Sequence, residues 1–187
     1  MATAARPDAP PSTIYHLTGP TGVRKILLAV LLGLVIAAAA VTAIGYALPQ
    51  GHVASREATF RAAPPAVFGA ISDVARYPEW RSDLTKVDLL ASSPLKWREH
   101  SGSDAIAFEA TEFRPPDLLQ VRIADEGLPF GGTWTYELFP DGAGTRLKIT
   151  ERGEVYNPIF RFVSKFIIGH TSTLETYLAD LQRRLTS

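Results

Sequence analysis

Three glutamates stand where chemistry is possible, each on a strand face expected to be internal. Alternation along the strands places Glu99, Glu112 and Glu151 on the same side as large apolar residues. A buried carboxylate is costly unless it is paired or hydrogen-bonded. Each is therefore either a polar handle or general base with a raised pKa, or a strand-end residue that meets an arginine, a backbone amide or water. A one-residue bulge would turn any of them outward.

His170 is the other residue that could act on a ligand. It lies in a helical stripe with spacings of three or four, made of Ile159, Val163, Phe166, His170, Leu174, Tyr177, Leu181 and Leu185. An imidazole there could be an acid/base group above a cavity, or a core histidine bonded to Tyr156, a carboxylate or a carbonyl. With Glu151 or Glu112 it would give a cyclase, dehydratase or hydrolase its acid/base pair.

Composition narrows the chemistry further. The chain has no cysteine, so thiolate chemistry and disulfides are excluded, and its formal net charge of +0 argues against a nucleic-acid partner. It has no Gly-x-Ser-x-Gly elbow and no phosphate-binding glycine loop. Its four histidines are scattered, so we expect no metal site and no cofactor.

The elements that would position these residues follow from periodicity and turn chemistry. The pattern predicts a first strand over Val53 to Ala62, then short helices over Pro65 to Ser72 and Asp73 to Trp80. A long helical segment is expected from Asn157 to about Leu185. Six further strands are predicted at Leu84 to Leu90, Leu95 to His100, Ala105 to Phe113, Leu118 to Ala124, Thr133 to Phe139 and Thr145 to Val155. The short breaks between strands imply an antiparallel sheet that buries one face against the helix, an α+β arrangement.

Three stretches of sequence carry a family resemblance. They are PPAVFGAISDVARYPEW from Pro64, ATEFRPPDLLQVRIAD from Ala110, and LPFGGTWTYELFPDGAGTRLKITERGEVYNPIFRFVSKFIIGH from Leu128. With the order of elements, they resemble the SRPBCC superfamily of START-like helix-grip proteins, and within it the polyketide cyclase/dehydrase group. The resemblance covers Ala54 to Leu185 and implies a seven-stranded curved sheet wrapped on a long C-terminal helix. It also implies a cavity for an apolar small molecule, without indicating cyclisation.

The residues expected to line that cavity share an inward position or an aromatic side chain near it. They are Trp80, Trp97, Glu99, Phe108, Val121, Ile123, Trp134, Tyr136, Ile149, Phe166, His170 and Tyr177.

A long apolar run precedes the domain. Ile26 to Ala47 contains no charged residue, and about 20 apolar residues match a bilayer core of about 30 Å. Tyr46 fits an interfacial aromatic and Pro49 ends the helix. A cleaved signal peptide and a buried core helix are the alternatives. The expected organisation is a disordered tail at 1–22, a transmembrane helix at 23–48, a linker at 49–55 and the domain at 56–187.

Three functions remain open at this point. We expect a membrane-anchored binding or carrier module for a hydrophobic, lipid-like molecule rather than an enzyme. The alternatives are the His170 enzyme above and a structural or interaction domain with a filled core. Arg24 and Lys25 favour a cytoplasmic tail and an extracytoplasmic domain. No feature of the sequence identifies a protein partner.

Overall fold

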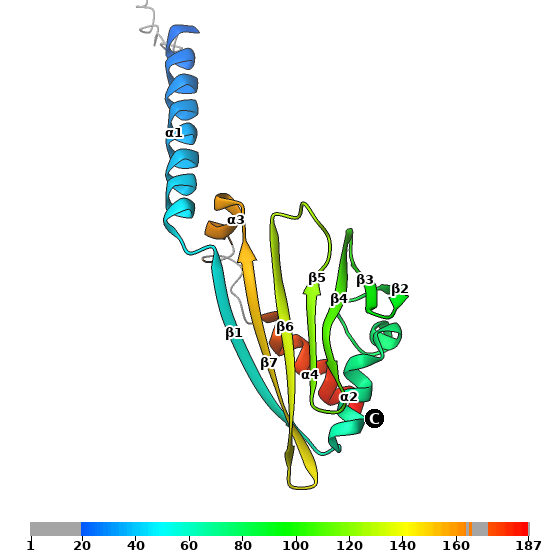
Figure 1. Ribbon diagram of the computed structural model, residues 1–187. Coiled ribbons are helices and arrows are strands. Elements are labelled where there is room, and N and C mark those ends of the chain that lie inside the picture. Colours follow the sequence, from blue (N-terminus) through cyan, green and yellow to red (C-terminus); the bar gives the residue numbers. More distant parts are fainter. Residues whose placement is uncertain (1–19, 164, 166–171, 187) are drawn as a thin grey trace, which may run out of the picture. The chain divides into compact units, whose positions relative to one another are not determined.

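The computed structural model describes residues 20–163, 165 and 172–186. It forms two compact units, one ending at Ala40 and the other running from Val41 to Ser187, and each is described by itself. Its helices and strands (Figure 1) are α1 (Pro20–Ala47), β1 (Gly51–Phe60), α2 (Pro64–Ser72), η1 (Val74–Glu79), β2 (Lys86–Ser92), β3 (Leu95–Ser101), β4 (Asp104–Arg114), β5 (Leu118–Ile123), β6 (Phe130–Asp141), β7 (Gly144–Val155), α3 (Pro158–Val163) and α4 (Ser172–Thr186).

Helix α1 contains the apolar run. Gly22–Ala47 is long and apolar enough to cross a membrane, and the most apolar stretch of this helix has no buried side chain. A core helix of a soluble protein would be mostly buried, so that interpretation does not fit. A membrane span and a signal sequence both remain compatible with this helix.

Seven antiparallel strands form one curved sheet in the order β1-β7-β6-β5-β4-β3-β2 (Figure 1). Strand β1 pairs with β7 along its whole length, from Gly51 opposite Glu154 to Phe60 opposite Thr145. Bulges interrupt the register between Leu89 and Ala91 and between Ala110 and Glu112. The seven-stranded sheet and the α+β class predicted from the sequence are confirmed.

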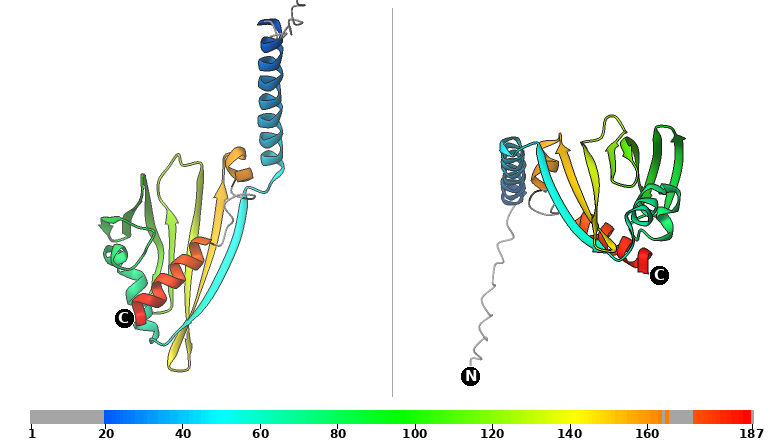
Figure 2. Two further views of the ribbon diagram at one scale, coloured as in Figure 1. Left: turned by 180° about the vertical axis from the view of Figure 1, so that it is seen from behind. Right: turned by 60° about the horizontal axis from the view of Figure 1, so that its bottom comes forward.

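Helix α4 crosses the hollow of the curved sheet (Figure 2). Leu174, Tyr177, Leu178 and Leu181 are buried, whereas the intervening Glu175 and Thr176 are exposed. This spacing of three and four places one apolar stripe toward the sheet. Helix α2 starts with Pro64 and Pro65, which suit the first helical turn, and buries Val67, Phe68 and Ile71.

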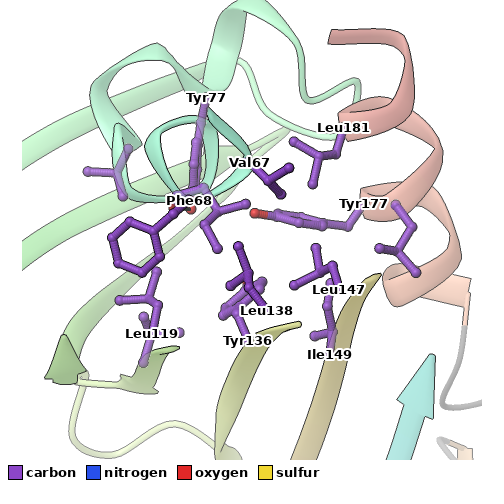
Figure 3. Close-up of a cluster of buried hydrophobic side chains, with 14 of the residues drawn as sticks. Val67, Phe68, Tyr77, Leu119, Tyr136, Leu138, Leu147, Ile149, Tyr177 and Leu181 are labelled. Atoms are coloured by element: carbon purple, nitrogen blue, oxygen red, sulfur yellow. Dashed lines mark hydrogen bonds between the residues drawn. The ribbon is translucent and has the colours of Figure 1, made fainter. Parts of the chain in front are cut away.

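One end of the sheet's inner face is packed solid (Figure 3). Val67 and Phe68 from α2 meet Leu119, Leu138 and Leu147 from three neighbouring strands, and none of these side chains is more than 4% exposed. Interiors packed this closely lose stability when even one methylene is removed.

One expected boundary needs correction, and another lies mostly outside the described residues. Strand β1 begins at Gly51, so most of the expected linker at 49–55 belongs to the sheet because it is paired with β7. The expected tail at 1–22 lies outside the described residues except for its last three, which are in α1.

The helical segment expected from Asn157 to Leu185 appears as α3 and α4, and residues 164 and 166–171 between them lie outside the described part. The predicted stripe holds for Leu174, Tyr177 and Leu181 but not for Ile159, which is 48% exposed. Ile159 lies in the short helix α3, which does not continue the buried face of α4.

Candidate functional site

The inner face of the sheet is hollow at the other end, beside η1 and the start of α4. A cavity of about 240 Å³ lies there. Its lining comes from η1 and the loop after it, from five strands and from α4: Tyr77, Arg81, Asp83, Leu84, Trp97, Glu99, Ser101, Asp104, Ile106, Phe108, Val121, Trp134, Tyr136, Ile149, Thr173, Leu174 and Tyr177. Ser101, Asp104 and Thr173 are exposed, so the cavity opens to solvent between the β3–β4 turn and α4.

Aromatic rings form most of its wall. Trp97 stacks on Phe108 with ring centroids 5.7 Å apart, and Phe108 meets Trp134 edge-on at the same distance. From the helix side, Tyr177 lies 5.6 Å from the ring of Tyr136. Apart from Tyr177, these rings come from β3, β4 and β6, where alternation turns every second side chain inward. The wall is therefore apolar, with polar tips where the tyrosine hydroxyls project.

A buried arginine is the most polar part of the wall. Both Oε atoms of Glu99 accept hydrogen bonds from Arg81 Nη1 at 2.9 Å, and Trp97 Nε1 donates to Glu99 Oε1 at 2.8 Å. Arg81 also makes a two-point contact with Asp83, at 3.1 Å from Nε and 2.7 Å from Nη2. Its guanidinium carbon lies 5.2 Å from the centre of the Tyr77 ring and 5.3 Å from that of Tyr177. Both are within the range of cation–π attraction.

Local chain geometry and a second buried carboxylate hold Arg81 in place. Helix η1 ends where the amides of Trp80 and Arg81 both donate to Tyr77 O. The next residue, Ser82, gives its backbone N–H and its hydroxyl to Asp180 Oδ2 at 2.6 and 2.9 Å. Asp180 is 1% exposed and lies on α4 one turn after Tyr177. This bond fixes the Arg81 loop against the helix that carries Tyr177.

Burial changes the pKa of the groups in this wall. It raises the pKa of Glu99 above its ordinary value, even though Arg81 and Trp97 favour the ionised form. Burial would lower the pKa of Arg81, but Glu99 and Asp83 outweigh it and raise that pKa. Burial also raises the pKa of Tyr77, Tyr136 and Tyr177 above the ordinary phenol value. The tyrosines therefore stay protonated and can donate hydrogen bonds, but they are poor bases at neutral pH.

The hydroxyl of Tyr177 has no hydrogen-bond partner of ordinary geometry among the described residues. Tyr177 is 6% exposed, and its side chain reaches from α4 into the core (Figure 3). Its neighbour Tyr77 donates its own hydroxyl hydrogen to Ile71 O at 2.6 Å. An unpaired buried hydroxyl costs roughly 1–3 kcal/mol. The Tyr177 hydroxyl lies near those of Tyr77 and Tyr136, which contribute to its raised pKa.

Residues 52–186 match the sequence model of a family described as polyketide cyclase/dehydrase and lipid transport. The chain belongs to this family. No curated protein shows significant sequence similarity to it.

Solved structures share the fold of this chain. A protein of Thermus thermophilus is 17% identical, with a TM-score of 0.62 over 72% of this chain and 97% of that one. A START superfamily protein of Mycobacterium smegmatis is 18% identical, with a TM-score of 0.56 over 72% and 97%. The Zhui aromatase/cyclase of Streptomyces is 12% identical, with a TM-score of 0.59 over 73% and 94%. At these identities the likeness shows the fold alone.

In this family member, most of the residues expected at the cavity lie along it. Those that line it are Trp97, Glu99, Phe108, Val121, Trp134, Tyr136, Ile149 and Tyr177. Trp80 does not line it, because it packs behind the wall against Tyr77 and Tyr177 at 5.3 Å. Ile123 stands at the end of β5, outside the lining. Phe166 and His170 lie outside the described residues.

Two of the expected inward carboxylates do not reach the cavity. Glu151 faces His52 across the β1–β7 pair, 3.4 Å from its Nε2, because it lies beyond the cavity toward the strand end. The side chain of Glu112 is 43% exposed and pairs with Arg114, because the bulge after Ala110 shifts its register. Of the three predicted glutamates, only Glu99 lines the cavity, and it is engaged by Arg81. Within the described ranges, no group of three or more histidine or acidic residues could hold a metal ion.

Sequence reasoning missed Arg81 and Asp83. Both follow η1 in a segment with no strand or helix period, so no alternation assigns them a face. The available signal was the predicted inward position of Glu99, since a buried carboxylate needs a cation or a set of donors. A buried Glu99 needs such a partner, but the sequence pattern does not indicate which arginine supplies it.

Proposed function

We propose that this protein is a membrane-anchored binding module for a compact apolar molecule that carries one hydrogen-bonding group. The cavity in the START-like fold would hold the molecule, and α1 would anchor the chain. The observation that carries the proposal is the aromatic-walled cavity, whose lining includes Tyr177, with a buried hydroxyl that has no partner of ordinary geometry among the described residues.

Cavity size bears on the class of molecule. The volume of about 240 Å³ is just below the roughly 300 Å³ at which ordinary ligand pockets begin. A two-chain lipid is too large for that space, so a lipid-like cargo is narrowed to a small ring system or a short single chain. Aromatic walls favour flat rings, which stack or pack edge-on against tryptophan and phenylalanine.

Charge bears on its polar group. Arg81 is already paired with Glu99 and Asp83, so an anionic ligand would meet two carboxylates and an occupied guanidinium. The raised pKa of Tyr177 keeps its hydroxyl protonated as a donor. A neutral carbonyl or hydroxyl oxygen is the acceptor that fits best.

The anchor would supply a source of such molecules. An apolar ligand partitions into the bilayer, and a domain attached to a membrane span stays beside that reservoir. Basic residues before the span, Arg24 and Lys25, support a cytoplasmic tail.

Naphthol, a neutral two-ring molecule with one hydroxyl, is a suitable probe. Trp97 and Trp134 line the cavity, so their fluorescence should change as naphthol binds. Tyr177→Phe should weaken binding by about two- to tenfold, the value of one hydrogen bond. Tyr156→Phe is the matched control, because Tyr156 is 44% exposed and outside the cavity.

Native mass spectrometry of protein extracted from its own membranes would identify the natural cargo. A co-purifying ring compound or short-chain molecule supports the proposal. Absence of any bound molecule, together with no naphthol response, would instead favour an interaction domain. Equal affinities of wild type and Tyr177→Phe would remove Tyr177 from the site.

A further inference from the structure

The short helix α3 exposes large apolar side chains that the cavity does not use. Ile159 is 48% exposed and Phe160 is 49% exposed, and Tyr156 just before the helix is 44% exposed. Asn157 fixes the start of α3, since its Oδ1 accepts the amides of Ile159 and Phe160 at 2.9 and 3.2 Å. Single exposed apolar residues are ordinary, but three within five positions form a small patch.

Arg161 ties α3 to the last turn of α1. Its guanidinium donates to the carbonyl oxygens of Gly45 at 3.1 Å and Leu48 at 3.3 Å. It also donates to those of Val155 at 2.8 Å and Tyr156 at 3.0 Å. The last carbonyls of a helix lack partners within it, and a cation is favourable at this end of the helix dipole. Arg161 therefore both caps α1 and joins it to the end of β7.

Close backbone packing supports the same contact. Gly45 is buried, and a Cβ there would collide with the carbonyl oxygen of Pro158. Glycine is the residue that permits such an approach. The residues that form this contact all belong to the unit from Val41 to Ser187.

This contact sets the depth of α3. The apolar run ends at Ala47, so in a spanning helix Gly45 lies near the boundary between hydrocarbon and headgroups. Tyr46, 69% exposed, has the residue type enriched at that boundary. A helix packed on Gly45 lies at the same level.

We infer that α3 lies in the interfacial layer of the bilayer at the C-terminal end of α1, with Ile159 and Phe160 inserted among the lipids. Arg161 and the exposed Lys165 add positive charge that favours anionic headgroups. The inference rests on the proposed anchor. The β3–β4 turn, beside which the cavity opens, and α3 lie at the same end of the strands (Figure 1).

Single-cysteine labelling tests this depth directly, because the natural chain has no cysteine. The full chain would be reconstituted in vesicles of phosphatidylcholine and phosphatidylglycerol, with an environment-sensitive fluorophore at one position. Phe160→Cys reports on α3, Val35→Cys on the middle of α1, and Ala143→Cys on the exposed β6–β7 turn. Nitroxide lipids labelled at the headgroup or deep in the chains act as quenchers.

We expect headgroup nitroxides to quench position 160, deep nitroxides to quench position 35, and neither to quench position 143. If position 35 is quenched and position 160 is not, the anchor stands and the inference about α3 is wrong. If position 35 is also unquenched and reacts with a water-soluble thiol reagent, the anchor itself is wrong and both fail.

A matched pair of charge variants separates the Arg161 contact from simple attraction to anionic lipid. Arg161→Gln and Lys165→Gln each remove one positive charge, but only the first removes the bonds to Gly45 and Leu48. Quenching at position 160 should be lost in Arg161→Gln and kept in Lys165→Gln, in neutral and anionic vesicles alike. Equal losses confined to anionic vesicles would overturn the role of Arg161. Unchanged naphthol binding would show that the domain of each variant is folded.

Discussion

The two ends of the sheet's inner face are built from the same strands but filled differently. On β7, Leu147 packs under α2 whereas Ile149, two residues on, borders the cavity; on β5, Leu119 and Val121 divide in the same way. The packed end is mostly aliphatic, with Phe60 and Phe68 as its buried rings, and the hollow end is walled by aromatic rings and the Arg81–Glu99 pair. All four of these strand residues are almost fully buried, so burial alone does not distinguish core from binding site.

What separates the two ends is side-chain shape and the covering element. Short branched residues from α2 interdigitate with leucines of the sheet, as in an ordinary core. Large flat rings from η1, α4 and the strands meet edge-on or at a tilt beside the cavity. The comparison predicts that the packed end determines stability and the hollow end determines binding.

Leu147→Ala should have the largest effect on stability. Removing a fully buried leucine from the packed end is expected to lower the free energy of unfolding by about 2–5 kcal/mol. Ile149→Ala is the matched variant on the same strand and should lie at the low end of that range, because one side of Ile149 already faces the cavity. Urea denaturation of both measures the difference. A larger loss of unfolding free energy for Ile149→Ala than for Leu147→Ala would contradict the distinction between a packed end and a hollow end.

Arg81→Met tests the charged part of the hollow wall. Breaking a buried ion pair leaves Glu99 without its cation, so we expect a loss of about 3 kcal/mol at neutral pH. Lowering the pH should reduce that loss as Glu99 becomes protonated. Arg76→Met is the control, because Arg76 pairs with Glu79 at the surface and its loss should not change the unfolding midpoint measurably. Similar unfolding midpoints for the two variants would show that the buried Arg81–Glu99 pair contributes no more stability than the surface Arg76–Glu79 pair.

Substitutions that add a large side chain should affect the two ends of the inner face differently. Ile106→Trp places a large ring in the cavity and should abolish naphthol binding while changing the unfolding free energy by less than about 1 kcal/mol. Leu119→Trp forces the same ring into the packed end and should cost about 3 kcal/mol. Fluorescence titration and urea denaturation of the pair provide both readouts. Retained naphthol binding in Ile106→Trp would place the site elsewhere.

The smallest expected effect is a pH dependence. The native pKa of Glu99 lies above its unfolded value of about 4.3, so the native state holds more protons between the two values. Stability from this group is therefore complete below about pH 4.3 and falls as the pH rises through the native pKa, by at most about 1.4 kcal/mol per pH unit. Glu99→Gln should lack that component. The measurement is the unfolding free energy of wild type minus that of Glu99→Gln as a function of pH. A difference that is constant, or that increases with pH, would show that burial does not raise the pKa of Glu99.

Most of the fold could be read from the sequence because period and turn chemistry are local. Alternation in Trp134, Tyr136 and Leu138 assigned a strand and a face together, and Pro140 to Gly144 marked the turn that follows. The α+β class and the seven-stranded sheet follow from such signals.

The site was less accessible, since its polar part comes from a loop. Arg81 has no periodic neighbours, and its inward position depends on Asp180, about a hundred residues later, bonding to Ser82. The bulge that turns Glu112 outward lies between Ala110 and Glu112 in the pairing of β4 with β5, and strand alternation in β4 does not reveal it. Contacts between distant segments of the chain decided these positions.

The connection between α1 and β1 has a mechanical consequence. Only Leu48, Pro49 and Gln50 lie between α1 and β1, which is paired with β7 along its whole length. These three residues span about 10 Å at full extension. Under the proposed anchoring, so short a connection keeps the domain at its own membrane, where it diffuses laterally with the span. Ligand exchange would then depend on lateral diffusion in the membrane and on molecules that come to the anchored domain, because the domain itself does not leave the membrane.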